Sequence, residues 1–522
     1  MGRRTALALL LLICGAALGL RIWGIRWGVP QAPYWDAYHP DERVGFRVAY
    51  RISYEQQDLN PHYFINPSWH YYTLALACRV GSWLKLVPSI AQIGEGQARL
   101  EDITDIWVLG RMISVLLGTL AVVLIYLAAL RATGSRVWGL AAAGMTACSP
   151  VLAVQSHFIT VDGPAVFWLL LAFVLLQSAF DKPGIGRALL AGAAGGLAAA
   201  TKYSAVAIAL PAMVAFGHLI ARSGGARAAG LKSAAAYAAG MAGGFVLGCP
   251  YSVLAWGEFR AGLAQMAGYT DFVTDFAYPW LTGLRLALGW PLWLMFLASL
   301  AVSLIKPTIR EAMALSLVGG FGLVLGYKAS PYYRHLLLAL PFAFLMMASA
   351  AARLAGWLAG TRWRPLLIAW SACLALGTAY ALANSVGWVG LMAGRDTRDE
   401  AADYIRRQYP EGSAIAVPSI YDFYCPDLQG YRVLRLQYDP GRLEQNMPRT
   451  IVATDYEREG LIFCKGSPDD ARRLFDRIER AYVPVKTFKH APRCCGLTFT
   501  GYPVTDWRYA YPQITIYEKS CR

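Results

Sequence analysis

The sequence has few charged residues for its length. Asp, Glu, Lys and Arg make up only 16% of its 522 residues, whereas hydrophobic residues make up 56% and the mean hydropathy is +0.38. Soluble globular proteins carry about 25% charged residues, so this composition excludes an ordinary soluble protein. It is typical of a chain that crosses a membrane several times.

Paired metal-ligand spacing and internal repeats are also missing. None of the ten cysteines forms a C-x-x-C pair, which disfavours a zinc site. Half of them lie near the C-terminus, which suits an oxidising compartment and one or two disulfides, although the spacing fixes no pairing. Zinc stays the rival interpretation for these five cysteines: Cys425, Cys464, Cys494, Cys495 and Cys521.

The net charge of +15 does not indicate a nucleic-acid partner. Most Lys and Arg residues lie in short loops between apolar runs, where basic residues set the orientation of a membrane protein. We therefore expect no nucleic acid and a membrane lipid environment.

Long apolar runs dominate the first three quarters of the chain. Residues 5–20 follow two arginines and have no convincing cleavage site, so we expect a retained helix. Residues 69–87 are expected to form a juxtamembrane helix in the interface. Small residues at 191–196 and 239–244 would let helices approach closely. Including the first helix, about eleven spans are expected, the others near 106–130, 137–155, 164–180, 188–201, 204–220, 233–250, 281–305, 311–327, 335–352 and 365–389.

The loops predict a sided molecule. With the N-terminus inside, every inside loop is basic, in agreement with the positive-inside tendency. The opposite, extracytoplasmic side then receives the segments 41–42, 156–162, 201–203, 258–278 and 328–335. We expect an integral, multi-pass protein of a prokaryotic plasma membrane, with its polar groups gathered on the outer face.

The composition changes near residue 390. We divide the chain into a transmembrane domain, 1–392, which includes an outer loop at 23–105, and a soluble extracytoplasmic domain, 393–522. The second part carries signals for a helix from residue 397 to 407 and a strand at 413–417, typical of an α/β or α+β domain. The fold class is thus a polytopic α-helical membrane protein with a C-terminal soluble domain.

The cluster at residues 38–43 carries two adjacent carboxylates. Asp41 or Glu42 could act as a general base, since ionisable groups at a lipid boundary are costly and often functional. Alternatively they cap a helix with Pro40, or form surface ion pairs with Arg43 and Arg47.

Three further positions suggest chemistry. Asp162 lies in a very short outer loop, although it could merely cap the helix that begins at Gly163-Pro164. Lys202 interrupts some thirty apolar residues. A cation in such a segment requires an anionic partner, either a carboxylate such as Asp162 or a phosphate. Arg334 and His335 could contact phosphate or anchor a helix at the interface.

Taken in order, these motifs resemble the GT-C membrane glycosyltransferases, the superfamily of the protein O-mannosyltransferases and the lipid A aminoarabinose transferases. The residues that carry the resemblance are 40–42 (PDE), 66–72 (NPSWHYY), 111–114 (RMIS), Asp162, 196–203 (GLAAATKY), 333–335 (YRH) before Pro341, and 396–402 (DTRDEAA).

The resemblance implies a sugar donor on a polyprenyl phosphate, an acceptor hydroxyl on a glycan, lipid or protein, and an inverting displacement. It makes Asp41 the general base, with Glu42 and Asp162 as the other catalytic candidates. The residues expected to bind substrate are His39, Arg43, Asn66, His70, Lys202, Tyr203, Tyr333, Arg334 and His335. Two departures matter: the aminoarabinose transferases have a lysine where this chain has Asn66, and their arginine after the acidic pair is spaced differently from Arg43.

No cofactor is expected, and a divalent metal held by Asp41, Glu42 and Asp162 is the less favoured alternative. An oligosaccharyltransferase or glycan ligase is the nearest enzymatic rival. A lipid-linked sugar flippase or transporter is disfavoured because the halves show no repeated pattern of spans.

Overall fold

The computed structural model describes residues 1–30, 37–52, 58–89, 92, 99–222, 224–268, 274–419, 424–459 and 469–520. The helices of its first part are α1 (Arg3–Ile22), α2 (Pro40–Tyr50), α3 (Trp69–Trp83), α5 (Leu100–Thr133), α6 (Arg136–Ala147), α7 (Pro150–Gln155), α8 (Asp162–Asp181), α9 (Ile185–Thr201), η2 (Tyr203–Ile208), α10 (Ala209–Ile220), α11 (Gly225–Gly248), α12 (Tyr251–Leu254), α13 (Trp256–Gly268), η3 (Pro279–Leu284), α14 (Arg285–Leu304), α15 (Ile309–Lys328), η4 (Tyr333–Leu336), α16 (Leu340–Leu358) and α17 (Arg364–Ala393).

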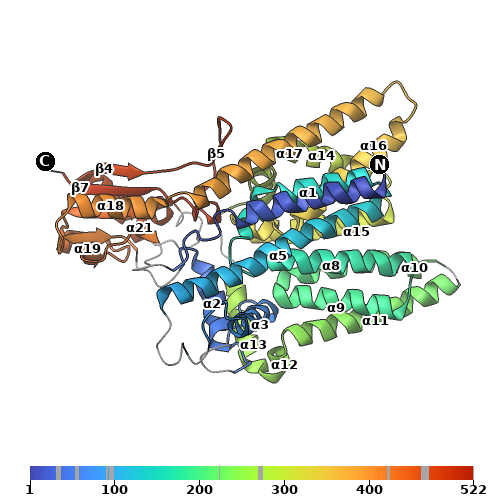
Figure 1. Ribbon diagram of the computed structural model, residues 1–522, viewed down its shortest axis with the longest axis horizontal. Helices are drawn as coiled ribbons and strands as arrows, with labels where there is room; N and C mark the ends of the chain where they lie inside the picture. Colours follow the sequence, from blue (N-terminus) through green and yellow to red (C-terminus); the bar gives the residue numbers. More distant parts are fainter. Residues whose placement is uncertain are drawn as a thin grey trace.

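The long helices run side by side, and the N-terminus lies at the end of the bundle away from the C-terminal sheet (Figure 1). Within the described residues, eight helices are long and apolar enough to cross a membrane. They match eight of the expected spans. The other three expected spans fall on α6 with α7, on α9 and on α11, which lie outside this set. The polytopic helical fold is therefore confirmed, with fewer helices of full spanning length and apolar composition than expected.

One expected span, 137–155, is broken into α6 and α7. The break lies at Cys148 and Ser149, directly before Pro150, which begins α7. Proline lacks an N–H and disfavours a helical residue before it, so the run cannot continue as one helix. The juxtamembrane helix expected at 69–87 is present as α3.

The two stretches of small residues pack against each other. A Cβ added at Gly192 or Gly196 of α9 would collide with the backbone of α11, and one added at Gly240 or Gly244 would collide with the backbone of α9. The expected close approach of helices is therefore present. It joins α9, which is followed directly by Lys202, firmly to its neighbour.

The C-terminal part contains a five-stranded sheet in the order β2-β1-β3-β7-β4. Strands β2, β1 and β3 are parallel, and β7 is antiparallel to both β3 and β4. The elements are α18 (Thr397–Gln408), β1 (Ala414–Val417), β2 (Arg432–Arg435), α19 (Pro440–Asn446), β3 (Thr450–Thr454), α20 (Asp455–Glu459), α21 (Asp469–Ala481), β4 (Tyr482–Phe488), β5 (Arg493–Cys494), β6 (Leu497–Thr498), η7 (Asp506–Arg508) and β7 (Ile514–Lys519).

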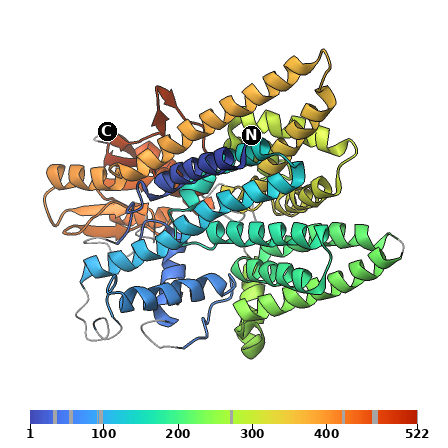
Figure 2. The same ribbon diagram turned by 45° about the vertical axis from the view of Figure 1, so that its right-hand side comes forward.

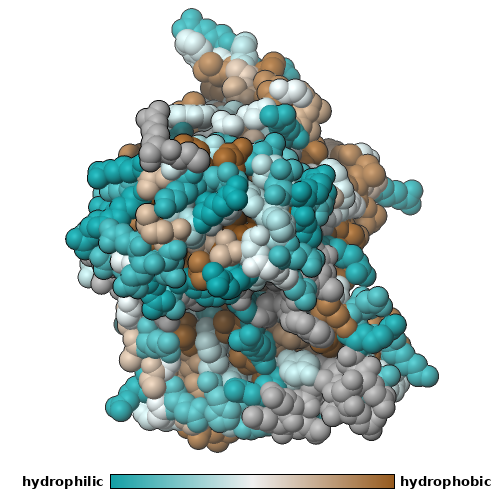
Figure 3. Space-filling view, turned by 90° about the vertical axis from the view of Figure 1, so that its left-hand side faces the viewer, coloured by the Kyte–Doolittle hydropathy of each residue, from teal (hydrophilic) through white to brown (hydrophobic). Residues whose placement is uncertain are grey.

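Alternate side chains of the sheet pack against helices on its two faces. Ile415 and Val417 lie in one apolar cluster with Ile405 of α18, and Ala416 lies in the other with Leu474 of α21. This alternation follows from the two-residue period of a strand. The helix and strand expected at 397–407 and 413–417 are thus present, and the outward end of this region is largely hydrophilic (Figure 3).

A segment between β6 and β7 returns from the sheet region into the helical core. Trp507 and Tyr511 are buried in the same apolar cluster as the membrane helices. Asn384 of α17 donates to the Tyr502 hydroxyl at 2.8 Å, and Trp388 packs on Tyr502 with ring centroids 4.9 Å apart. The C-terminal part is therefore wedged against the bundle, and the division at residue 392 remains a prediction.

Candidate active site

Helix α2 presents Asp41 at its first turn. His39 is the N-cap, and its Nδ1 accepts the backbone N–H of Asp41 at 3.2 Å, while Pro40 supplies a first helical residue that needs no N–H partner. His39 is buried against Phe158 and Tyr509, with ring centroids 4.2 and 4.8 Å away. The start of α2 is therefore rigidly held.

Asp41 forms an ion pair with Arg334. The Asp41 side chain keeps 47% of its surface accessible. Burial acts to raise the pKa of Asp41, but the guanidinium of Arg334 together with the charges of His39 and Lys202 outweighs this effect and holds the pKa below its usual range. Asp41 is consequently an ionised carboxylate that an external molecule can reach.

Glu42 faces the other way and is fully buried with Arg111 of α5. The guanidinium of Arg111 donates Nε to Oε1 at 2.9 Å and Nη2 to Oε2 at 2.7 Å. Arg111 also binds the carbonyls of Ile25 and Trp27, and Glu42 accepts the N–H of Ile159 at 2.8 Å. Both carboxylate oxygens are therefore engaged, and Glu42 fixes α2 to α5 and to the turn before α8.

Asp162 and Lys202 form a second ion pair beside the first. Asp162 is the first residue of α8. Lys202 follows the last residue of α9 and has an extended backbone, so its ammonium group lies where the chain passes from one helix to the next. Their side chains are 8% and 17% exposed. The charge of Lys202 acts on Asp41 and His335, and that of Asp162 acts on Arg334, which places both pairs in one electrostatic cluster. The expected convergence of Asp41, Asp162, Lys202 and Arg334 is thus present.

Arg334 and His335 come from the short helix η4, between α15 and α16. Nδ1 of His335 lies 2.5 Å from the Ser330 hydroxyl. Burial, together with the nearby cations Lys202 and Arg334, lowers the pKa of His335 well below its usual value. His335 is therefore neutral near pH 7 and can only exchange hydrogen bonds with a ligand.

Several expected substrate residues are used within the protein. The Tyr203 hydroxyl donates to the carbonyl of Phe64 at 2.9 Å, and the buried Tyr333 hydroxyl accepts from Gln155 at 3.0 Å. Asn66 forms a hydrogen bond with the Tyr71 hydroxyl, and Arg43 is half-buried on α2. Contact of these four residues with substrate remains a prediction.

His70 on α3 is 1% exposed, and neither ring nitrogen has a hydrogen-bond partner among the described residues. Burial lowers the pKa of His70 to about 4, although the carboxylate of Asp162 opposes the shift. His70 is therefore neutral and buried, and the charge of Asp162 acts on it.

No local sequence pattern predicted the contribution of the C-terminal part to the site. Asp506 accepts the backbone N–H groups of Tyr333 at 3.1 Å and of Arg334 at 3.0 Å. Tyr509 lies between His39 and the Arg334–Asp41 pair. The aromatic run at residues 507–511 marks a buried segment, but nothing in its pattern names the helix that it contacts.

A second connection lies at the start of α18. Asp396 binds Arg398 through both oxygens and accepts the indole N–H of Trp27 at 3.0 Å. Tyr38 donates to Asp399 at 2.9 Å, and the Arg398 guanidinium lies 3.9 Å from the Tyr38 ring centroid. The segment before α2 is thus clamped to the C-terminal part. The motif at residues 396–402 was expected to open the soluble domain, and this clamp is its structural role.

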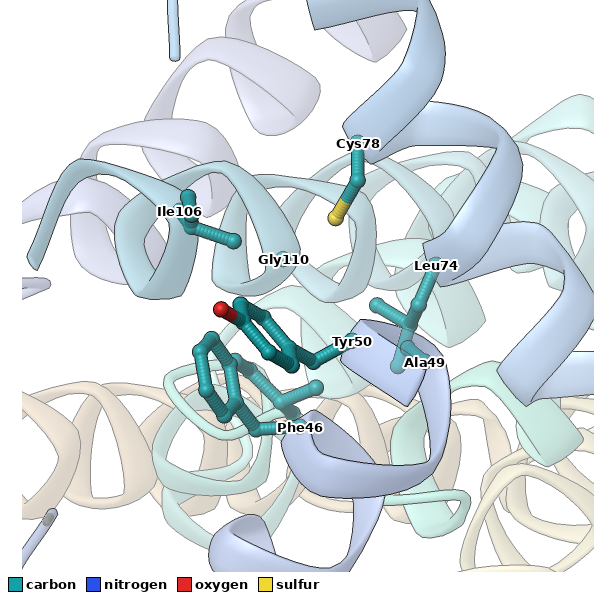
Figure 4. Close-up of a pocket in the computed structure, with 8 residues that line it drawn as sticks. Phe46, Ala49, Tyr50, Leu74, Cys78, Ile106 and Gly110 are labelled. Atoms are coloured by element: carbon teal, nitrogen blue, oxygen red, sulfur yellow. The ribbon is translucent and has the colours of Figure 1, made fainter. Parts of the chain in front are cut away.

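An apolar pocket lies between α2, α3 and α5 (Figure 4). It is partly open to the outside. Phe46 and Tyr50 of α2 form one wall, and Gly110 of α5 leaves room for Ile159. The lining residues are Phe46, Ala49, Tyr50, Leu74, Cys78, Ile106, Gly110 and Ile159.

Two other groups of residues bear on metals and disulfides. Within the described ranges, no three His, Cys, Asp or Glu side chains lie together as a metal-binding group. Cys494 and Cys495 are free thiols and Cys425 is buried, whereas Cys464 and Cys521 lie outside the described residues. The expected disulfides and the absence of a cofactor both remain predictions.

Comparison with known proteins agrees with this geometry. Residues 99–256 match the family described as dolichyl-phosphate-mannose-protein mannosyltransferase. No curated protein matches the chain at a significant level.

Solved structures share the fold over almost the whole chain. The oligosaccharyltransferase of Archaeoglobus fulgidus in its apo form aligns with a TM-score of 0.53 and 13% identity, over 97% of this chain and 75% of that one. ArnT from Cupriavidus metallidurans, bound to undecaprenyl phosphate, aligns with a TM-score of 0.50 and 14% identity, over 98% and 97% of the two chains. The chain is accordingly a multi-pass integral membrane protein with the fold of the GT-C membrane glycosyltransferases, and it resembles their O-mannosyltransferase and ArnT branches.

Proposed function

We propose that this protein is a glycosyltransferase that moves one sugar from a polyprenyl-phosphate donor to an acceptor hydroxyl on the extracytoplasmic face, with inversion at the anomeric carbon. The observation that carries the proposal is the accessible, ionised Asp41, which is paired with Arg334 and lies within reach of the charge of Lys202. A base and two cations are what such a displacement requires.

In the proposed step, Asp41 takes the proton of the acceptor hydroxyl while that oxygen forms a bond to the anomeric carbon. The bond between the anomeric carbon and the phosphate oxygen breaks, and the lipid phosphate leaves with the electron pair. Arg334 and Lys202 stabilise the charge that develops on the phosphate, and His335 contributes a hydrogen bond. Asp162 orients Lys202 and shares in holding the acceptor.

The two ion pairs suggest how the donor activates the base. Before the donor binds, Arg334 neutralises Asp41 and Lys202 neutralises Asp162. A lipid phosphate that binds here competes with the carboxylates of Asp41 and Asp162 for Arg334 and Lys202. The interaction between Arg334 and Asp41 then weakens, and the pKa of Asp41 rises toward the usual range. The carboxylate therefore becomes a stronger base when substrate is present.

The comparisons support the class of donor and acceptor. ArnT was solved with undecaprenyl phosphate, and the A. fulgidus enzyme was solved with a tethered acceptor peptide. The family match at residues 99–256 favours a single sugar over an oligosaccharide. The basic loops of the chain favour the outer face for the reaction.

We further propose that the reaction needs no metal. Asp41 and Asp162 are each already paired with a cation of the protein, while Glu42 has both oxygens bound by Arg111 and the Ile159 N–H. Such a donor set suits protein cations better than a divalent ion. Transfer is therefore expected to continue in the presence of excess EDTA.

The decisive experiment incubates purified protein with a panel of radiolabelled polyprenyl-phosphate sugars and compares the native chain with Asp41→Asn. Loss of a general base is expected to lower kcat by about 10²- to 10⁴-fold. Glu101→Gln is the matched control, because Glu101 is an exposed acid whose side chain is 81% accessible at the start of α5. Undiminished transfer by Asp41→Asn would remove Asp41 from the role of base.

The same assay separates the rival functions. Transfer only from a lipid-linked oligosaccharide would favour an oligosaccharyltransferase. Movement of labelled donor across a liposome membrane without any transfer would favour a flippase. The anomeric configuration of the product, measured by NMR, tests inversion.

A further inference from the structure

Strands β5 and β6 form a small hairpin whose turn carries two adjacent cysteines. Arg493 pairs with Thr498 and Cys494 pairs with Leu497, which leaves Cys495 and Gly496 as a two-residue turn. Their φ angles are +50° and +77°. Two positive φ angles in a row are the signature of a type I′ turn, and only glycine takes this conformation without strain. Cys495 therefore occupies a position that ordinarily favours Asn, Asp or Gly.

The turn brings the two thiols together at the surface. Sγ of Cys494 lies 3.5 Å from Sγ of Cys495, at hydrogen-bonding distance. Cys495 is exposed and Cys494 is partly exposed, and both are free thiols. The hairpin projects from the sheet region beside α17 in both ribbon views (Figures 1 and 2). Nothing in the proposed transfer reaction uses this pair.

The hairpin is anchored at its base. The N–H of Phe499 binds the carbonyl of Pro492 at 2.9 Å, and the Phe499 ring packs on Tyr380 with centroids 5.4 Å apart. A Cβ added at Gly387 of α17 would meet the backbone of residues 492–493 at 3.0 to 3.2 Å. The turn therefore keeps both thiols in place while its tip stays open to solvent.

We propose that Cys494 and Cys495 are a redox modification site, which a low-molecular-weight disulfide such as oxidised glutathione converts reversibly into a vicinal disulfide. The Cys495 thiolate attacks one sulfur of the small disulfide, and a mixed disulfide forms as one small thiolate leaves. The Cys494 thiolate then attacks Sγ of Cys495, and the second small thiolate leaves. The protein loses two protons and two electrons, and the small disulfide is reduced to two thiols.

The geometry makes the bond labile. Adjacent Cα atoms are about 3.8 Å apart across a trans peptide, below the separations of about 4.4–6.8 Å at which disulfides are ordinarily found. The sulfurs must also approach from 3.5 Å to about 2.05 Å. Strained, exposed disulfides are easily reduced and belong to the regulatory class. The pair is thus expected to respond to the surrounding thiol balance instead of forming a permanent cross-link.

The test uses the full-length protein in detergent, equilibrated with mixtures of reduced and oxidised glutathione and then trapped with a maleimide. Trypsin releases residues 494–508, a peptide that contains Cys494 and Cys495 and no other cysteine. With excess oxidised glutathione, its mass is expected to fall by two hydrogen atoms, with no glutathione attached. Excess reduced glutathione should restore two maleimide-reactive thiols. Cys495→Ser is expected to leave one glutathione on Cys494, and Cys373→Ser, at an exposed thiol of α17, should change nothing in this peptide.

Three results would overturn the proposal: two thiols that stay free in oxidised glutathione, one or two glutathiones bound to the native peptide at equilibrium, or a disulfide from this peptide to another cysteine. The native protein alone decides between these results, so the test does not depend on whether a variant folds.

Discussion

The carboxylate of Asp506 accepts the backbone N–H of Arg334 at 3.0 Å, although 172 residues separate them in the sequence. It also accepts the N–H of Tyr333, so it closes the first turn of the short helix that carries the arginine. Arg334 in turn pairs with Asp41. The C-terminal part therefore fixes the position of the cation that lies against the proposed base.

Replacing Asp506 tests this connection. Asp506→Asn keeps the size of the side chain but removes the charge that holds two N–H groups, so kcat/KM is expected to fall about tenfold, equivalent to about 1.4 kcal/mol. Burial raises the pKa of Asp506 to about 6, with Arg334 opposing the shift. Native activity should therefore decline as the pH falls through 6, whereas the variant should lack this part of the acid limb.

The carboxyl group of Asp506 also affects the free energy of unfolding, and this effect has the opposite dependence on pH. Because its folded pKa lies above the ordinary value of about 3.9, the native state binds more protons than the unfolded state between about pH 4 and 6. The contribution of Asp506 to the free energy of unfolding is thus lost as the pH rises through this window. Thermal unfolding of the native protein and of Asp506→Asn at about pH 4.5 and about pH 7 checks the sign. Identical pH dependence in both proteins would contradict it.

Glu42 and Arg111 are expected to act as a structural pair. Glu42→Gln should lower the free energy of unfolding by about 3–5 kcal/mol, because it leaves a buried guanidinium without its counter-charge. The double variant Glu42→Met with Arg111→Met should lose less than the sum of the two single variants. Thermal unfolding in detergent measures Glu42→Gln, the single variants Glu42→Met and Arg111→Met and the double variant, with Glu101→Gln as the exposed control. Additive losses would argue that the two side chains are not coupled.

Lys202 and Asp162 should differ in their effect on transfer. Lys202→Ala removes a cation from the proposed phosphate site and is expected to lower kcat by about 10²- to 10³-fold, as loss of an oxyanion partner does. Asp162→Asn leaves the ammonium in place and should cost less. Steady-state kinetics with the labelled donor compares them, and a greater loss in Asp162→Asn would assign the main role to the carboxylate.

The contact between α9 and α11 offers a matched pair of glycines. A Cβ at Gly244 would collide with the backbone of Ala193, whereas a Cβ at Gly243 would have nothing within 4 Å. Gly244→Ala is therefore expected to destabilise the protein by about 1–3 kcal/mol. Gly243→Ala should be neutral or stabilise it slightly, since alanine is the better helix former. Unfolding curves in detergent that coincide for the two variants would contradict this packing.

Local patterns were sufficient for much of this structure. Apolar length and basic loops predicted most of the long helices, and the small residues at 191–196 and 239–244 predicted a close helix contact that the structure contains. These features depend on the solvent around each segment and on side-chain size, which the sequence states directly. The number of full-length spans was overestimated where Pro150 breaks a run and where α9 is short.

The partners within the site could not be predicted in the same way. The prediction that these groups share one side of the membrane brought Asp41, Asp162, Lys202 and Arg334 together. It did not distinguish Asp41, which is accessible and pairs with Arg334, from Glu42, which is buried with Arg111. Adjacent residues on a helix diverge by about 100°, and only the packing of α2 on α5 decides which of them turns inward. Asp506 carries no local signal at all.

The sequence by itself therefore determined most of the membrane-spanning helices, the grouping of Asp41, Asp162, Lys202 and Arg334, and the first helix and strand of the C-terminal part, because periodicity and composition act over short stretches of chain. Only the tertiary structure decided which charges pair and that residues 506–509 complete the site, because those contacts join segments hundreds of residues apart and depend on how the helices pack.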